Sequence, residues 1–369
     1  MVGKAYDVIV VGAGIFGSCT AYHCQRLGLR TLLLEQYSLG HSNGSSHGKS
    51  RIIRYAHTDP EYVPLVGDSY LQIEELEKKR GEKLWNKLGL LWAATGNQVD
   101  SISGHLKKHN IDHEVLPGTK ITERYPQFKF DDKWTALIDP MGGVIYANKW
   151  LKAFQEEFIT LGGTIQDNEP VISYGETDNV IVNVKTSTGE YKTNKIIFTV
   201  GCWITKFFPN VNFQIKPISL AVCYWNAKDE KNNHLLDEKH FPVVIAKNLE
   251  KKEYFFALPD TDYPGAIKLV LDEGDDLAGD LSHPTKNNQE LVTIPGSFIK
   301  DHIPNSPDHH YLIGPVSSEN SKILVGGCGS GSGFKTAPGI GRSLAEMAAG
   351  KSTTVDVTFF SPSRFETPA

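Results

Sequence analysis

The first 35 residues constrain the fold of this chain more than any other segment. An apolar run, Tyr6–Val11, is followed at once by Gly12-Ala13-Gly14-Ile15-Phe16-Gly17. The run suits a strand buried on both faces, and the apolar spacing of residues 18–27 suits a helix. A second apolar stretch, residues 31–34, ends at Glu35. A strand, a glycine turn, a helix, a second strand and a terminal acid, in this order, predict a dinucleotide-binding βαβ unit.

Each part of this motif has a physical role in binding a dinucleotide. Gly12 permits the tight turn, Gly14 lets the backbone approach a pyrophosphate, and Gly17 allows close packing of helix and strand. The N-terminus of the helix offers free N–H groups and a partial positive charge to the phosphates. Glu35 is placed to accept hydrogen bonds from the ribose hydroxyls of an adenosine. The motif alone leaves FAD and NAD open.

Composition excludes several classes of function. The chain has 369 residues, enough for two domains, and its net charge of -5 comes without a dense basic cluster, which argues against nucleic-acid binding. No apolar stretch approaches the roughly 18 residues of a membrane span. Five cysteines without a C-x-x-C pair argue against a disulfide framework, and no metal site is expected. We expect no signal peptide, and the C-terminal Glu-Thr-Pro-Ala is not a peroxisomal tripeptide.

The remaining sequence alternates predicted helices and strands. Helices are predicted over residues 62–79, 147–161, 287–302 and 338–349, the third interrupted by Pro295 and Gly296. Strands are predicted over residues 90–94, within 164–199, and over 218–225, 242–246, 253–258, 266–271 and 322–325. The last strand runs into glycines and a helix, which repeats the opening pattern.

The repeated pattern predicts an α/β fold, α+β overall, in which a Rossmann-type domain is interrupted by an antiparallel-sheet substrate domain. The expected cofactor domain comprises residues 1–84, 145–216 and 310–369. The expected substrate domain comprises residues 85–144 and 217–309.

Further segments carry a family resemblance. They are residues 44–54, which include His47-Gly48-Lys49-Ser50-Arg51-Ile52-Ile53-Arg54, and residues 62–65, 142–146, 263–268 and 331–335. With the N-terminal motif, these segments resemble the flavin amine oxidase family of monomeric sarcosine oxidase and peroxisomal sarcosine/L-pipecolate oxidase, nearly end to end.

This resemblance favours FAD over NAD as the cofactor. It implies oxidation of a secondary amino acid, such as sarcosine or L-pipecolate, to an imine, with dioxygen reduced to hydrogen peroxide. The expected partners are this small amino acid and dioxygen. We further expect a monomer in peroxisomes, as in the family, or in the cytoplasm.

Four cationic residues are the candidates for catalysis. Arg51 and Arg54 lie three positions apart and would point to opposite faces of a strand. By themselves they could be a surface pair. The resemblance assigns Arg51 to the flavin ring and Arg54 to the substrate carboxylate, which a guanidinium fork matches with two parallel bonds. Lys335 would be a second carboxylate contact. Lys268 would lie beside the flavin and promote its reaction with oxygen, although its spacing alone suits the solvent side of an edge strand.

The resemblance also implies a set of cofactor-binding residues. They are Gly12, Gly14, Ile15, Phe16, Gly17, Glu35, Ser45, His47, Arg51, Val171, Gly201, Gly329, Gly331, Gly333, Phe334 and Lys335.

The chain departs from the family pattern at several positions. The family's segment with a flavin-attaching cysteine would fall beside Asn305, where on the order of fifteen residues are missing. Cys328 aligns with a glycine and is no natural substitute, so we predict non-covalent FAD. Ser332 and Asp272 stand where histidines are usual, and Phe256 stands in place of a tyrosine.

These departures keep other functions open. One is a flavin dehydrogenase with an electron acceptor other than oxygen. Another is a degenerate flavoprotein that retains the fold without turnover. A nicotinamide-dependent dehydrogenase remains open from the N-terminal motif alone.

Overall fold

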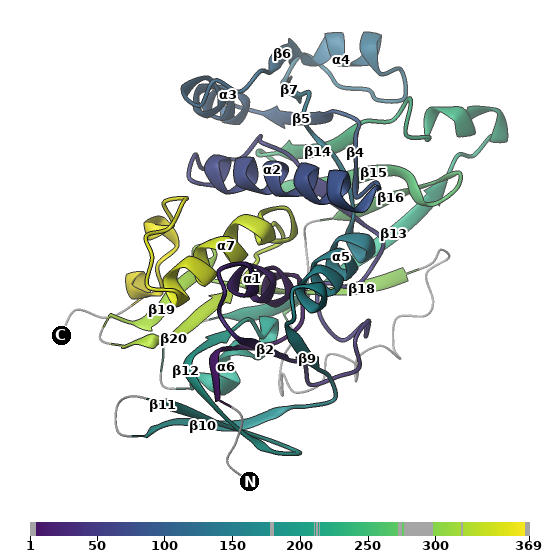
Figure 1. Ribbon diagram of the computed structural model, residues 1–369. Helices are drawn as coiled ribbons and strands as arrows, with labels where there is room; N and C mark the ends of the chain where they lie inside the picture. Colours follow the sequence, from purple (N-terminus) through teal and green to yellow (C-terminus); the bar gives the residue numbers. More distant parts are fainter. Residues whose placement is uncertain are drawn as a thin grey trace.

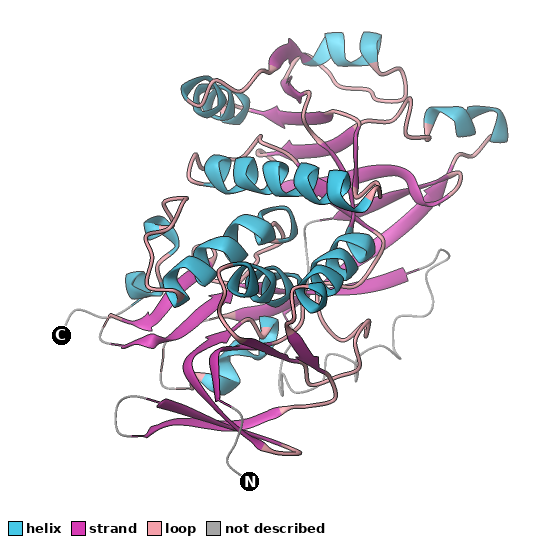
Figure 2. Ribbon diagram, viewed as in Figure 1, coloured by secondary structure: helices cyan, strands magenta, loops and turns pink. Residues whose placement is uncertain are grey.

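The computed structural model describes residues 5–177, 181–209, 211, 213, 215–271, 275–276, 298–318 and 320–365. Two large sheets and one small sheet form the frame of the molecule, and helices cover them (Figures 1 and 2). No helix in these ranges is both long and apolar enough to cross a membrane.

The first sheet is built around the N-terminal strand. β1 (Ala5–Val11) pairs in parallel with β2 (Thr31–Leu34) on one side and with β12 (Glu190–Phe198) on the other. β9 (Thr164–Gln166) extends the sheet beyond β2, and β20 (Asn320–Gly327) pairs in parallel with β12. These strands are almost continuously apolar because both faces of a parallel sheet are covered. Antiparallel strands complete it: β10 (Val171–Thr177), β11 (Ile181–Thr186) and β19 (Leu312–Ser317).

Helices from both ends of the chain cover this sheet together. α1 (Ile15–Arg26) packs against α7 (Ala337–Ala348) and α5 (Ala147–Thr160), and the three lie side by side in Figure 1. α2 (Tyr62–Arg80) packs on α7. The short α6 (Ile204–Phe207) follows β12.

The second sheet is mainly antiparallel. Its order is β17-β13-β16-β15-β14-β5-β7-β6, and β18 also pairs with β13. The strands are β5 (Leu90–Thr95), β6 (Glu114–Pro117), β7 (Trp134–Asp139), β13 (Lys216–Asn226), β14 (Val243–Asn248), β15 (Glu253–Tyr263), β16 (Ala266–Leu271), β17 (Asp275–Asp276) and β18 (Phe298–Asn305). α3 (Gln98–Lys108) and α4 (Gly118–Arg124) pack on its β5 and β7 strands.

A small three-stranded sheet supplies the segment with the two arginines. β3 (Ser50–Ile53) and β4 (Trp85–Lys87) both pair with β8 (Gly143–Tyr146) in antiparallel register.

The predicted fold class is confirmed, and most predicted elements agree with the observed ones within a few residues. The helix predicted over residues 287–302 is wrong where the structure describes it, because residues 298–302 belong to β18. Residues 287–297 lie outside the described residues. The domain limits given above remain a prediction.

Candidate active site

A large cavity of about 770 Å³ lies where β1 and β2 end. Residues at these carboxyl ends line it, including Gly12 and Glu35, and so do residues of the second sheet, such as Lys268. The crevice outside the carboxyl ends of parallel strands is where this type of fold binds ligands. The volume lies within the range of cofactor and small-molecule sites.

The glycine turn leaves no room for side chains. Gly12 has φ +96°, and a Cβ atom there would lie 2.7 Å from the carbonyl oxygen of Thr199. A Cβ atom on Gly17 would lie 1.8 Å from the carbonyl oxygen of Gly12. The first N–H of α1, that of Ile15, donates to Ser46 Oγ at 3.0 Å. The turn and the loop that carries Ser46 therefore bring backbone N–H groups and a hydroxyl to the cavity, where a pyrophosphate could accept hydrogen bonds.

Glu35 is buried at the end of β2 and faces the same cavity. Its Oε2 accepts a hydrogen bond from the Ala13 N–H at 2.8 Å, and its Oε1 accepts one from the Tyr37 N–H at 3.0 Å. His41 Nε2 lies 3.3 Å from Oε1. Burial opposes ionisation, but the hydrogen bonds from His41 and from the two backbone N–H groups outweigh it and lower the pKa of Glu35. The carboxylate is thus held as an acceptor beside the glycine turn.

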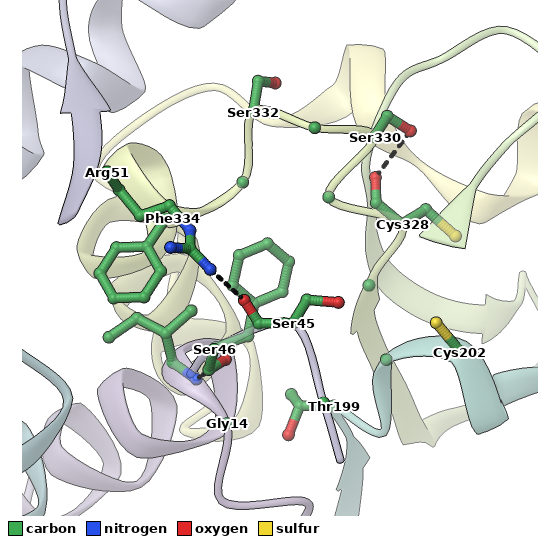
Figure 3. A pocket seen from close by; sticks show the side chains of 18 of the residues that line it. Gly14, Ser45, Ser46, Arg51, Thr199, Cys202, Cys328, Ser330, Ser332 and Phe334 are labelled. Carbon is green, nitrogen blue, oxygen red and sulfur yellow. Dashed lines mark hydrogen bonds between the residues drawn. The ribbon is translucent and has the colours of Figure 1, made fainter. Parts of the chain in front are cut away.

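Arg51 ties the loop before β3 to the cavity wall. Its guanidinium donates to the carbonyl oxygens of Ser45 at 3.0 Å, His47 at 2.7 Å and Ser50 at 2.9 Å. It also lies 5.8 Å from the ring centroid of Phe334, and Figure 3 shows the ring and the guanidinium side by side. Arg51 therefore fixes the 45–48 loop and presents its charge on the cavity wall.

Arg54 follows the last residue of β3 and is buried. Its guanidinium lies 4.8 Å from the ring centroid of Trp92 and donates to the carbonyl oxygen of Ala56. The strand ends before Arg54, and both arginines line the same cavity, so the predicted placement on opposite faces of one strand does not describe them. The backbone beyond Arg54 is held by Asp139, whose Oδ2 accepts from the N–H groups of Tyr55 at 2.6 Å and Ala56 at 3.1 Å.

Lys335 is buried in the turn before α7. Its Nζ donates to the carbonyl oxygen of Ser332 at 2.7 Å. The hydroxyl of the buried Tyr311 donates to the same carbonyl at 2.9 Å and accepts from Thr336 Oγ1 at 3.0 Å. Tyr311 therefore braces the Gly331–Phe334 turn from behind.

The two buried cations at this end of the cavity repel each other. Burial lowers the pKa of Arg54 to about 10. Burial, together with the charge of Arg54, lowers the pKa of Lys335 well below its ordinary value. The imidazole of His57 is stacked on the ring of Tyr62. Its pKa is lowered by burial and by the nearby charges of Arg54, Lys335 and Lys247, so the imidazole is neutral at physiological pH. An anion bound here would relieve the repulsion.

Lys268 enters the cavity from β16 and is buried, which excludes the solvent face of an edge strand. Its Nζ donates to the carbonyl oxygen of Ser50 at 3.2 Å. Asp262 Oδ2 lies 3.8 Å from Nζ. The amine is therefore fixed between β3 and β15, on the wall that also carries Arg51.

The cavity brings together all but one of the residues predicted for the site. The exception is Gly17, which packs against Gly12 behind the turn. The other predicted cofactor-binding residues that line the cavity are Gly14, Phe16, Val171, Gly201, Gly329, Gly331 and Gly333. Cys328 and Phe256 also line it, and Cys328 is buried with φ +57° beside Ser330 (Figure 3). Asp272 lies outside the described residues.

Sequence reasoning missed several side chains that build the site. Ser46 caps α1, Asp139 holds the backbone after Arg54, and Tyr311 braces the turn before Lys335. The sequence could have indicated Asp139, because this residue ends a strand just before the turn that leads into Gly142-Gly143. It gave no such indication for Tyr311, since its partner lies 21 residues away.

The residues present fit FAD. The cradle at Gly12 and Gly17 would be filled by any Cβ atom, the Glu35 carboxylate beside it is an acceptor suited to ribose hydroxyls, and basic side chains line the same cavity. The family's sequence profile, "FAD dependent oxidoreductase" (DAO), matches residues 7–347. The chain belongs to the DAO family of FAD-dependent oxidoreductases.

Curated relatives cover nearly the whole chain. A Caenorhabditis elegans protein named "Putative sarcosine oxidase" is 59% identical over 98% of this chain and 98% of its own length. The peroxisomal sarcosine oxidase of Mus musculus is 32% identical over 98% and 97%. The monomeric sarcosine oxidase of a Bacillus species is 26% identical over 97% of each.

Solved structures share the fold. The L-proline dehydrogenase of P. horikoshii superimposes with a TM-score of 0.81 over 99% of each chain, at 19% identity. The Tyr258Phe mutant of the amino acid oxidase NikD gives 0.78 over 97% of each chain, at 21% identity.

Proposed function

We propose that this protein is an FAD-dependent amine oxidase that converts a secondary amino acid, such as sarcosine or L-pipecolate, to an imine while dioxygen is reduced to hydrogen peroxide. The observation that carries the proposal is that two buried basic side chains, Arg54 and Lys335, line the cavity that also contains the dinucleotide cradle. The names of the relatives, sarcosine oxidases of animals and bacteria, support the same substrate class.

The carboxylate of the substrate would lie between Arg54 and Lys335. The guanidinium fork offers two parallel N–H bonds to its two oxygens, and Lys335 supplies a point charge. Trp92, packed under the guanidinium, restricts the rotation of Arg54. Together these contacts hold the amine in one orientation and convert binding energy into alignment for transfer.

When bound, the isoalloxazine of FAD accepts hydrogen from the carbon next to the substrate nitrogen and passes the electrons to dioxygen. Lys268 would place a fixed cation beside the ring, where negative charge develops during the oxygen step. Arg51 would contact the ring edge. The turn before α7 brings further backbone N–H groups to the same wall, at the positive end of the helix.

We further propose that FAD is held without a covalent bond, that the protein is a monomer, and that it acts in peroxisomes or the cytoplasm. The absence of a cysteine from the attachment position supports the first proposal. The names of the monomeric and peroxisomal relatives support the others.

An absorption spectrum of the purified protein, followed by a peroxide assay across N-methyl and cyclic amino acids, tests the proposal. A flavin spectrum with peroxide formed from one of these substrates is the expected result. Flavin reduction under anaerobic conditions without peroxide in air would instead identify a dehydrogenase. Bound flavin that no amino acid reduces would identify a degenerate flavoprotein, and a colourless protein would overturn the proposal.

A further inference from the structure

Asp262 is a buried carboxylate next to the cavity but not on its wall. It lies near the end of β15, and Lys268 lies on β16, the other strand of the same hairpin. Its side chain is 2% exposed and that of Lys268 is 7% exposed. Among the described residues, Lys268 lines the cavity and Asp262 does not. Asp262 can therefore act on the cavity only through the residues that it contacts.

The contacts of Asp262 are few. Its Oδ2 accepts a hydrogen bond from the hydroxyl of Tyr224 at 2.6 Å and lies 3.8 Å from Lys268 Nζ. Its Oδ1 is buried and has no hydrogen-bond partner among the residues that the structure describes. A distance of 3.8 Å is too long for a hydrogen bond, so Asp262 acts on Lys268 through its charge.

Two cations of the described residues also lie near this pair. Lys49 Nζ donates to the backbone carbonyl of Asp262 at 3.0 Å and lies 4.4 Å from the ring centroid of Tyr263. Burial and the hydrogen bond to Asp262 raise the pKa of Tyr224, and the nearby charge of Arg51 partly opposes this rise. Burial and neighbouring cations both disfavour the charged form of a lysine, whereas a carboxylate at ion-pair distance favours it.

We propose that Asp262 is a positioning residue that keeps the buried amine of Lys268 protonated, so that a fixed cation faces the flavin at neutral pH. The inference rests on the proposed function, which places Lys268 beside the bound FAD. Asp262 does not line the cavity, so it acts through Lys268. It determines how alkaline the solution must become before Lys268 loses its charge.

The test uses FAD-loaded protein and two measurements. The first is the absorbance spectrum of oxidised bound flavin as a function of pH, which responds to loss of charge beside the ring. The second is the rate at which photoreduced enzyme is reoxidised by oxygen, followed over the same pH range by stopped flow. Neither measurement needs substrate.

Asp262→Asn should move both transitions to lower pH by about one unit or more. Below its new transition, the reoxidation rate should return to within about twofold of the wild-type rate, because acid restores the cation. Lys268→Met should lack the spectral transition and reoxidise about tenfold more slowly or worse at every pH. Tyr224→Phe removes a neutral hydrogen bond and keeps the carboxylate, so its shift should be smaller.

Asp260→Asn is the matched control. Asp260 lies on the same strand, and its carboxylate accepts from the Gly265 N–H at 2.8 Å, so the variant removes an equal charge that faces the turn. Its transitions should coincide with those of the wild type. Asp262→Asn transitions that coincide with the wild type, or a slow rate that acid does not restore, would overturn the inference. If Lys268→Met reoxidises normally, the oxygen role of Lys268 fails instead, and the spectral transition still decides whether Asp262 sets its charge.

Discussion

Replacing Lys335 by methionine should weaken the binding of a carboxylate ligand while sparing the corresponding uncharged amide. Lys335 Nζ uses one of its three N–H bonds on the Ser332 carbonyl, so two can meet a ligand. A hydrogen bond to a charged group contributes about 1.5–3 kcal/mol, which corresponds to roughly 10- to 150-fold in the dissociation constant. Methionine keeps the length of the side chain, so the packing against the turn changes little.

The charge of Lys335 also predicts a proton movement. In the free enzyme, burial and Arg54 lower the pKa of Lys335, and a bound carboxylate raises it again. Between these two pKa values the complex holds more protons than the free enzyme, so binding takes up protons from the buffer. The uptake should increase as the pH rises from below the lower pKa, and it should vanish in Lys335→Met.

Isothermal titration calorimetry of FAD-loaded protein with propionate, in two buffers of different ionisation enthalpy, measures both effects. Flavin absorbance gives the dissociation constant independently. Propionamide, the uncharged amide of the same acid, is the control ligand, and its affinity should change by less than about twofold. Equal losses for both ligands would show that Lys335 supports the flavin or the fold. Heat that does not depend on the buffer would refute the lowered pKa.

Three further predictions concern Glu35, Asp139 and His23. Glu35→Ala should weaken FAD binding by about 1.5–3 kcal/mol, because a charged hydrogen bond to the ribose is lost; unchanged flavin occupancy after dilution would contradict this. Asp139→Ala leaves buried backbone N–H groups without their acceptor, so the free energy of unfolding should fall by about 1–3 kcal/mol for each in a denaturant titration. Burial lowers the pKa of His23 from 6.5 to about 3, so its contribution to stability is present above pH 6.5 and is lost as the pH falls. Between pH 7.5 and 5 about 2 kcal/mol should disappear, and His23→Gln should abolish that part of the slope.

The sequence predicted those parts of the site that depend on local patterns. The glycine turn and Glu35 are read from a strand–helix–strand motif, because the dinucleotide cradle is built within 35 residues. Arg54, Lys268 and Lys335 needed the family resemblance, since spacing alone allowed surface roles for each.

Contacts between residues far apart in the sequence could not be predicted from local patterns. Asp262 and Tyr224 are 38 residues apart, and nothing in either segment indicates that their side chains meet. The helix predicted near residue 300 failed because residues 298–305 pair with β13, about 80 residues earlier in the chain, and such pairing overrides local propensity.

The place of β1 has a consequence for how the protein is made. β1 precedes the other described elements in the sequence, yet Ile9 pairs with Ile196, and β12 pairs in turn with β20, which lies more than 300 residues after β1. α1 likewise packs on α7. Contacts of such sequence separation form slowly, because a long loop must close before they are gained. The sheet and helices that support the glycine turn are therefore complete only after β20 and α7 have left the ribosome, although the turn itself lies within the first 35 residues.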